Sequence, residues 1–204
     1  MTTPSAAHKY ATGASTTKIH GRDNIIIISR TLRAVGKLNE LAQLERYNWN
    51  IIGLCKVHWK NFGGITTDEG HKLYFKGRGD SHGIGFLVHK GIVNSIMGCC
   101  PVSSRLITIC LRATAFNITI MQAYAPTSNY DDNKLENFYN QLQDVLENSP
   151  MKEILFVQGD WNAKVGVDSQ TNWQSTCGPF CNAKTNVRGH RLLEFAAYNK
   201  ILCL

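Results

Sequence analysis

The sequence predicts a mixed α/β domain built in layers, in which runs of β-strands are flanked by helices. Three observations lead to this prediction. Short apolar runs typical of buried strands recur along the chain, and three segments carry apolar residues at helical spacing. The chain has 204 residues, 43% of them hydrophobic and only 5 of them Pro, which suffices for one domain with a substantial core. No internal repeat or linker divides it.

The N-terminal part is expected to be a tail followed by the first strand. Residues 1–22 contain no Asp or Glu and include Lys9, Lys18 and Arg22, so we expect a disordered basic tail. An organellar transit peptide has a similar composition, but no clear amphipathic pattern supports one. The predicted domain covers residues 23–204. Four consecutive isoleucines indicate that it begins with a buried central strand at residues 24–29.

The middle of the chain alternates between further strands and loops. A helix is expected after Gly36, with Leu38 and Leu41 among its apolar residues, and it ends near Tyr47. A strand follows at 50–54, and two glycines mark a loop at 61–64. Further strands are expected at these positions: 71–76, 84–89, 105–112 and 116–123.

The clearest helix covers residues 131–147. Asp131 and Asp132 favour its N-terminus, and Pro150 follows its end. Its apolar residues recur on one helix face: Leu135, Phe138, Tyr139, Leu142, Val145 and Leu146. A strand at 153–157 and a last helix at 188–199 complete the predicted domain.

The charge balance favours a polyanionic partner. The 22 Lys and Arg outnumber the 15 Asp and Glu, giving a net charge of +7, and nucleic acid is the commonest partner of such a chain. A solvated, slightly basic surface has the same composition. No apolar stretch approaches the length of a membrane span, so no membrane partner is expected. The seven cysteines and the lack of a secretory signal indicate reduced thiols in an intracellular protein, nuclear or cytoplasmic.

The stretch at 157–166, VQGDWNAKVG, carries the strongest functional signal. It begins at the end of an apolar strand, so Asp160 and Asn162 project from the same side of extended chain. A carboxylate can hold a hard cation or accept a proton, and an amide can orient a phosphate oxygen. An Asp-Asn turn after a strand fits the same spacing equally well.

This stretch resembles the GD(W/F)NAKVG signature of the endonuclease/exonuclease/phosphatase superfamily. More narrowly, it is similar to the branch that contains craniofacial development protein 2 and the endonuclease domains of non-LTR retrotransposons. The resemblance covers about residues 23–204 and implies a DNase I-like, four-layer α/β sandwich of two mixed β-sheets flanked by helices. Further blocks match the branch in order: 30–32 with 36–38, 50–55, 58–60, 103–107, 122–127, 185–189 and 192–196.

The resemblance implies a DNA endonuclease of retrotransposon origin, in which Mg²⁺ or Mn²⁺ polarises the phosphodiester and an activated water attacks it. Asp160 would be the water-activating base and a metal ligand, Asn162 would orient the water and the phosphate, and Tyr124 would donate its phenol. Asn186 and Arg105 are further phosphate-binding candidates. The alternatives are a core aromatic for Tyr124, a loop asparagine for Asn186 and a surface strand residue for Arg105.

Departures from the family pattern weaken the implied metal site. Ile28 stands where the family has a metal-site Asn, and Lys56 stands where it has the metal-binding Glu. A unit-charge pair at 4 Å is worth about 4 kcal/mol at an effective dielectric near 20, so a lysine repels a divalent ion strongly. The family's closing block, with an Asp and a Ser-Asp-His triplet, has no counterpart before Leu204, so we expect the domain to be incomplete at its C-terminus. Weak metal binding and impaired catalysis follow.

Three hypotheses therefore remain open. The first is an active or residually active Mg²⁺-dependent endonuclease. The second is a non-catalytic relic that binds nucleic acid, DNA in preference to RNA, with Lys56 contacting a phosphate directly. The third is a protein-interaction module, against which salt-sensitive DNA binding would argue. The sequence indicates no particular oligomeric state.

Overall fold

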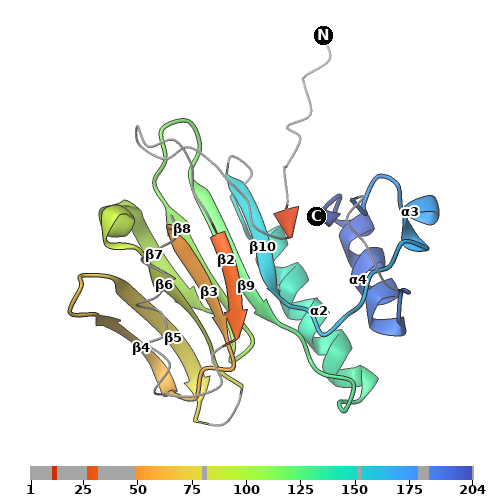
Figure 1. The fold of residues 1–204 in the computed structure, drawn as a ribbon, viewed down its shortest axis with the longest axis horizontal. Helices are drawn as coiled ribbons and strands as arrows, with labels where there is room; N and C mark the ends of the chain where they lie inside the picture. The colour runs from red at the N-terminus through yellow and green to blue at the C-terminus, as the bar shows by residue number, and fades with distance from the viewer. Residues whose placement is uncertain are drawn as a thin grey trace.

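Two β-sheets packed face to face form the body of the protein, and helices cover the outer face of one of them (Figure 1). The computed structural model describes residues 11–12, 27–31, 49–79, 82–150, 153–178 and 184–203. One sheet has five strands, in the spatial order β2 (Ile27–Thr31), β3 (Ile51–Cys55), β6 (Ile84–Val88), β5 (Lys72–Arg78) and β4 (Lys60–Thr66). The other has four, in the order β10 (Ile154–Asp160), β9 (Ile118–Tyr124), β8 (Leu106–Leu111) and β7 (Ile96–Pro101).

Both large sheets are mixed. The pairs β2–β3 and β9–β10 are parallel, whereas the remaining neighbours within these sheets are antiparallel. A separate two-stranded parallel ribbon joins β1 (Ala11–Thr12) to β11 (Leu202–Cys203). The described helices are a 3-10 helix (Lys90–Ser95), α2 (Asp132–Glu147), α3 (Ser169–Asn172) and α4 (Val187–Tyr198). None of the helices in these described segments is long and apolar enough to cross a membrane.

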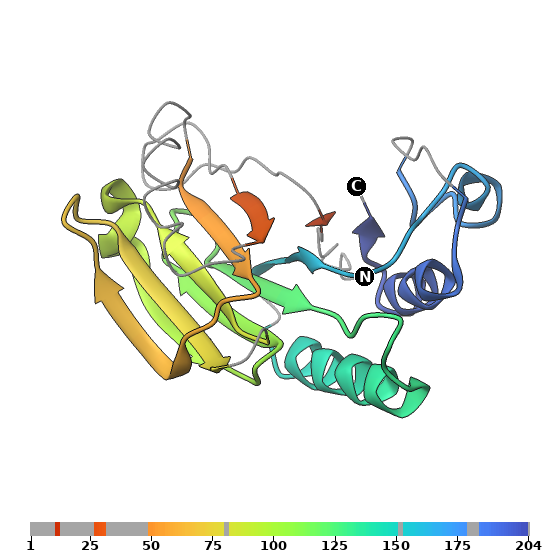
Figure 2. The same cartoon turned by 60° about the horizontal axis from the view of Figure 1, so that its bottom comes forward.

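Three apolar clusters hold the layers together. The first fills the space between the two sheets, where side chains such as Phe86 and Ile120 are fully buried. The second lies between the four-stranded sheet and the helices α2 and α4, which Figure 2 shows on the side of that sheet away from the five-stranded one. The third covers the other face of the five-stranded sheet, around Ile52 and Leu73. Burying one such side chain contributes about 1.5–3 kcal/mol.

Helix α2 shows how the local sequence produces these layers. Asp131 caps its N-terminus, because the carboxylate accepts a hydrogen bond from the backbone N–H of Lys134 at 2.8 Å. Its buried face points into the second cluster and consists of Leu135, Phe138, Tyr139 and Leu142. The periodicity in the sequence therefore predicted both the helix and its buried face correctly.

The predicted fold class is confirmed, and the structure corrects two of the predicted elements. Residues 61–64 belong to strand β4 and not to a loop, because the two glycines lie against the rings of Phe75 and Tyr74 on the paired strand, where a Cβ would crowd them. The isoleucine-rich strand β2 lies at the edge of its sheet, not at the centre. Strand β7 and the 3-10 helix before it were not predicted.

Two sequence predictions fall wholly or mostly on residues that the structure does not describe. The expected helix with Leu38 and Leu41, which would form the fourth layer, lies outside the described residues. Within the predicted tail, only residues 11–12 are described, and they form β1.

Candidate functional site

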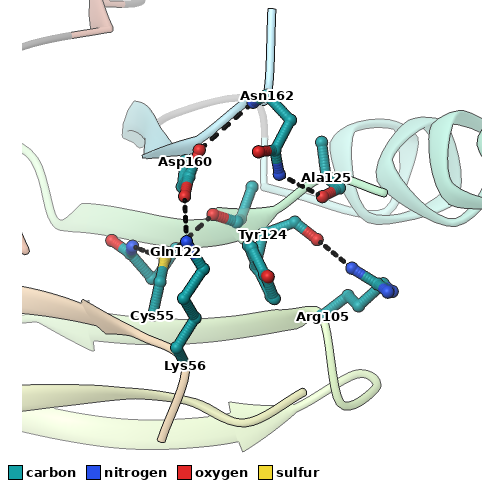
Figure 3. A network of polar contacts seen from close by, with 9 residues as sticks. Cys55, Lys56, Arg105, Gln122, Tyr124, Ala125, Asp160 and Asn162 are labelled. Carbon is teal, nitrogen blue, oxygen red and sulfur yellow. Dashed lines mark hydrogen bonds and ion pairs between the residues drawn. The ribbon is translucent and has the colours of Figure 1, made fainter. Parts of the chain in front are cut away.

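The candidate site lies where the carboxyl ends of three strands meet. Lys56 directly follows β3, Tyr124 ends β9 and Asp160 ends β10. Tyr124 and Asp160 stand opposite each other in the parallel register of β9 and β10. The Lys56 ammonium reaches across from the other sheet, with Nζ 3.4 Å from Oδ2 of Asp160 (Figure 3). Packing of the two sheets thus joins side chains that are 104 positions apart in sequence.

Gly159 allows β10 to lie close enough to β9 for this arrangement. Its φ of 155° is a conformation that residues with side chains rarely adopt, and a Cβ at this position would overlap the carbonyl oxygen of Ala123. The glycine before the acidic residue therefore sets the position of Asp160 beside Tyr124.

Both oxygens of the Asp160 carboxylate are engaged. Oδ2 faces the Lys56 ammonium, and Oδ1 accepts a hydrogen bond from the backbone N–H of Asn162 at 3.2 Å. This second contact is an Asx turn, so the turn and the site are formed by the same residues. Asn162 itself has a left-handed backbone with φ 48°, and its side-chain amide donates to the carbonyl of Ala125 at 2.7 Å. The turn therefore fixes the orientation of both polar side chains.

Two cations lie near the ring of Tyr124. The Lys56 Nζ is 5.6 Å from the ring centroid and the Arg105 Cζ is 5.1 Å from it. Arg105 also donates from Nη1 to the Tyr124 carbonyl at 3.0 Å, and it directly precedes β8 at this end of the sheet. Arg105 is therefore held at the site and is more than a surface strand residue.

The phenol of Tyr124 is suited to donate a hydrogen bond. The side chain is 4% exposed, and burial raises the pKa of Tyr124, an effect that the charges of Lys56 and Arg105 partly oppose. The group therefore stays protonated at neutral pH. Its hydroxyl makes no hydrogen bond to any part of the chain that the structure describes.

Asn186 is engaged at the N-terminus of α4. Its Oδ1 accepts hydrogen bonds from the backbone N–H groups of Gly189, at 2.8 Å, and Lys164, at 3.0 Å. It thus caps the helix and ties it to the loop that follows Asn162. These contacts explain a loop asparagine at this position, and a phosphate contact by Asn186 remains a prediction.

Ile28 is not level with the Lys56–Asp160 pair. The parallel register of β2 and β3 places Ile28 opposite Ile52, four residues before Lys56. At about 3.3 Å per residue, this corresponds to about 13 Å along the strands. The backbone register therefore does not bring Ile28 to the site.

Buried polar groups below the site were missed by the sequence reasoning. Gln122 donates from Nε2 to the Cys55 sulfur at 3.1 Å, and burial raises the pKa of the Cys55 thiol to about 11. The neighbouring Gln158 is 2% exposed, and its amide has no hydrogen-bond partner within the described segments. Gly53 leaves room for both glutamines, because a Cβ there would overlap them. A signal was present, since each glutamine precedes a site residue by two positions in an otherwise apolar strand.

The donor set fits a hard divalent cation poorly. Such an ion takes oxygen ligands, usually including several carboxylates, and Asp160 is the one carboxylate among the described side chains that form the site. Elsewhere in the described segments, no three His, Cys, Asp or Glu side chains gather closely enough to hold a metal ion. The ammonium of Lys56 lies beside the carboxylate oxygen that a metal would need. The arrangement is better suited to an anion with several acceptor oxygens.

Comparison with known proteins gives two related sequences. Over 170 residues the chain is 34% identical to craniofacial development protein 2 of Bos taurus and 32% identical to that of Tragulus javanicus. Each match covers 82% of this chain, but 28% and 29% of the respective relatives. The chain is therefore similar to a part of craniofacial development protein 2 and spans less than a third of the length of these relatives. No protein-family model matches the chain.

Comparison with solved structures shows the fold. The endonuclease domain of TRAS1, a telomere-specific non-LTR retrotransposon, is similar with a TM-score of 0.55 and 15% identity, over 84% of this chain and 71% of that domain. The AP endonuclease LMAP from Leishmania major is similar with a TM-score of 0.55 and 14% identity, over 85% of this chain and 66% of that enzyme. The chain thus has the endonuclease/exonuclease/phosphatase, DNase I-like fold.

Proposed function

We propose that the chain is a nucleic-acid-binding domain with an endonuclease fold, which recognises a phosphodiester at the Lys56–Asp160 pair and hydrolyses it slowly or not at all. The single observation that carries this proposal is the 3.4 Å contact between Lys56 Nζ and Asp160 Oδ2. It places a fixed cation beside the carboxylate of the GDWNAKVG stretch. A retrotransposon origin is part of the same proposal, supported by the similarity to the TRAS1 endonuclease domain.

Three of the site residues would hold a phosphate in different ways. Lys56 and Arg105 supply positive charge, and the protonated phenol of Tyr124 supplies a neutral donor between them. With Asp160 included, the site carries one net positive charge, because two cations face one carboxylate. DNA is the favoured polyanion, and the overall charge of +7 draws it to the surface.

The same geometry opposes hydrolysis. A water that attacks phosphorus must give a proton to a base, and Asp160 is the carboxylate in position to accept one. One of its oxygens faces the Lys56 ammonium and the other accepts the Asn162 N–H. These two contacts compete with an approaching water for the acceptor sites of the carboxylate. A bound Mg²⁺ would supply charge stabilisation in an intact site of this fold, but the residues here fit that ion poorly.

DNA binding provides the first test. Fluorescence anisotropy with a labelled oligonucleotide should detect binding in EDTA, without any need for Mg²⁺, and the affinity should fall steeply with salt. Lys56→Gln should weaken binding, whereas Lys90→Gln should not. Lys90 is an equally charged, exposed control at the opposite end of the sheet, because β6 ends at Val88 opposite the first residue of β3. Binding that requires Mg²⁺, or that does not respond to salt, would contradict the proposal.

Asp160→Asn separates charge from shape at the same site. It removes one like charge from beside the phosphate, an interaction worth about 1 kcal/mol at 4 Å in water, so DNA should bind about fivefold more tightly. Unchanged or weaker binding by this variant would mean that the phosphate does not lie at the pair.

Nicking of supercoiled plasmid in Mg²⁺ and in Mn²⁺ tests the catalytic half of the proposal. Wild-type protein should nick no faster than Asp160→Ala. Nicking by the wild type that disappears in Asp160→Ala would show that Asp160 works as a base despite Lys56, and the chain would then be an active endonuclease.

A further inference from the structure

Cationic side chains extend beyond the site to a second tyrosine. Tyr130 lies on the connection between β9 and α2, and the Arg105 Cζ is 5.2 Å from its ring centroid. The Lys134 Nζ is 5.0 Å from the same centroid. Arg188 of α4 donates from Nη2 to the Tyr130 carbonyl at 2.9 Å. Tyr130 is thus surrounded by three cations from three different parts of the chain.

A hollow of about 170 Å³ opens beside this tyrosine. Three of its lining residues, Lys134, Asn137 and Gln141, lie at positions i, i+3 and i+7 on one face of α2. The remainder of the lining consists of Arg105, Pro126, Tyr130 and Phe138. None of these residues carries a carboxylate. By contrast, the larger hollow of about 470 Å³ near the other end of α2 is lined in part by Asp144 and Glu153. The smaller hollow therefore has the chemistry of an anion site.

Most polar groups of this hollow are available to a ligand, whereas the Tyr130 hydroxyl is paired with Nε2 of His82. The Lys134 ammonium and the side-chain amides of Asn137 and Gln141 make no hydrogen bond or ion pair with any described residue. Arg105 commits one N–H to the Tyr124 carbonyl and has no carboxylate partner in the same segments. Two acidic residues precede Lys134 at the start of α2. Asp131 accepts a hydrogen bond from the backbone N–H of Lys134 as the helix cap. Asp132 is 97% exposed and 4.0 Å from Arg188.

Arg105 connects this hollow to the phosphate site. Its guanidinium carbon lies 5.1 Å from the Tyr124 ring and 5.2 Å from the Tyr130 ring, so the two rings can be no further apart than the sum of these distances. A guanidinium has five donors in a planar fork, and only one of them is committed to the Tyr124 carbonyl. Arg105 can therefore donate to anions on both of its sides.

We propose that the hollow formed by Arg105, Tyr130, Lys134, Asn137 and Gln141 is a second phosphate subsite, which holds the phosphate adjacent to the one at Lys56 on the same nucleic-acid strand. This inference rests on the function proposed above, because it assumes that a phosphodiester occupies the Lys56–Asp160 pair. The strand then runs from Lys56 past Tyr124 and Arg105 to Lys134. The two sites together explain why cations alternate with aromatic rings from Lys56 to Lys134.

Salt dependence of binding tests the subsite. A fluorescein-labelled oligothymidylate of about twelve nucleotides is titrated with the 204-residue chain at several salt concentrations. Each phosphate contact on a single strand contributes about 0.7 to the slope of log affinity against log salt concentration. Lys134→Gln should lower the magnitude of this slope by about 0.7, and Lys56→Gln/Lys134→Gln should lower it by about 1.4. Lys134→Arg, which keeps the charge, and Lys90→Gln should leave the slope unchanged.

The outcomes separate failure of the subsite from failure of the proposed function. If Lys134→Gln behaves like Lys90→Gln while Lys56→Gln lowers the slope, the subsite is wrong and the phosphate site stands. If Lys134→Gln weakens binding with an unchanged slope, the lysine has only a structural role and the subsite is again overturned. If the wild type shows no salt-dependent binding, both inferences fail. Lys134 is exposed on α2, so the variant should fold, and a thermal melt followed by circular dichroism verifies this.

Discussion

Replacing Lys56 with glutamate should raise the affinity of the site for divalent cations. The lysine ammonium now lies 3.4 Å from the Asp160 carboxylate, in the place where an ion would need a second acidic ligand. A glutamate at this position adds a carboxylate beside Asp160 and removes the repelling charge. The variant tests whether Lys56 is the feature that excludes the metal.

The size of the effect follows from the charges and their exposure. Each unit-charge pair is worth about 4 kcal/mol at 4 Å and an effective dielectric of 20, and the substitution changes the charge facing a divalent ion by two units. The side chains of Lys56 and Asp160 are 24% and 28% exposed, so water screens much of this energy. A retained gain of about 3 kcal/mol corresponds to about a hundredfold tighter binding.

Isothermal titration calorimetry with Mn²⁺ measures this change directly. Lys56→Gln removes the repulsion without adding a carboxylate, so its affinity for Mn²⁺ should fall between those of the wild type and Lys56→Glu. In EDTA, Lys56→Glu should melt at a lower temperature than the wild type because two carboxylates then face each other, and Mn²⁺ should restore the loss by binding the native state. A folded Lys56→Glu protein that binds Mn²⁺ no better than the wild type would refute the idea that Lys56 occupies the metal's position.

Three further predictions concern the residues that support the site. Gly159→Ala should destabilise the protein by about 3 kcal/mol or more, because its φ of 155° and the adjacent carbonyl of Ala123 exclude a Cβ. Gly98→Ala is the matched control, since a Cβ there meets nothing within 4 Å, and equal thermal midpoints for the two variants would disprove the argument. Gln158→Met should raise the free energy of unfolding, measured with urea, by about 1–2 kcal/mol, because the buried amide has no partner in the described segments. A loss of stability would show that this amide is hydrogen-bonded. Burial raises the pKa of Cys55 from 9.0 to about 11, above its value in the unfolded chain. Its stabilising contribution of about 2–3 kcal/mol is therefore complete below pH 9 and is lost as the pH rises through 11. Cys55→Ala should fall less steeply in stability over this range, and identical pH profiles would contradict the assignment.

The strands and helices with uninterrupted apolar patterns were predictable from the sequence. Strand β9 and helix α2 lie within a residue or two of their expected positions, because each buries a continuous run or stripe of apolar side chains. The glycine pair in β4 was wrongly predicted to form a loop. From sequence alone, paired glycines indicate a loop, because the neighbouring strand that they pack against is not known. The aromatic rings of β5 that fill the space above those glycines become visible only when the strands are paired.

The site was predictable only in part. The GDWNAKVG stretch indicated that Asp160 and Asn162 act together, and the structure shows them in one Asx turn. The contact of Lys56 with Asp160 depends on how two sheets pack, and no local pattern carries that information. Tyr130 and Lys134 belong to no motif. They became candidates only because the structure places Arg105 near the rings of both Tyr124 and Tyr130.

The parallel pairing of β9 and β10 also has a kinetic consequence. Tyr124 and Asp160 share one rung of this ladder, and Lys56 joins them only after the two sheets have docked. Contacts between residues so distant in sequence form late in folding, because the chain must close long loops before it gains from them. The proposed phosphate binding would therefore require the completed fold. A fluctuation that detaches β10 from β9 would separate Asp160 from Tyr124, whereas Arg105, Tyr130 and Lys134 lie outside β10 and would stay together.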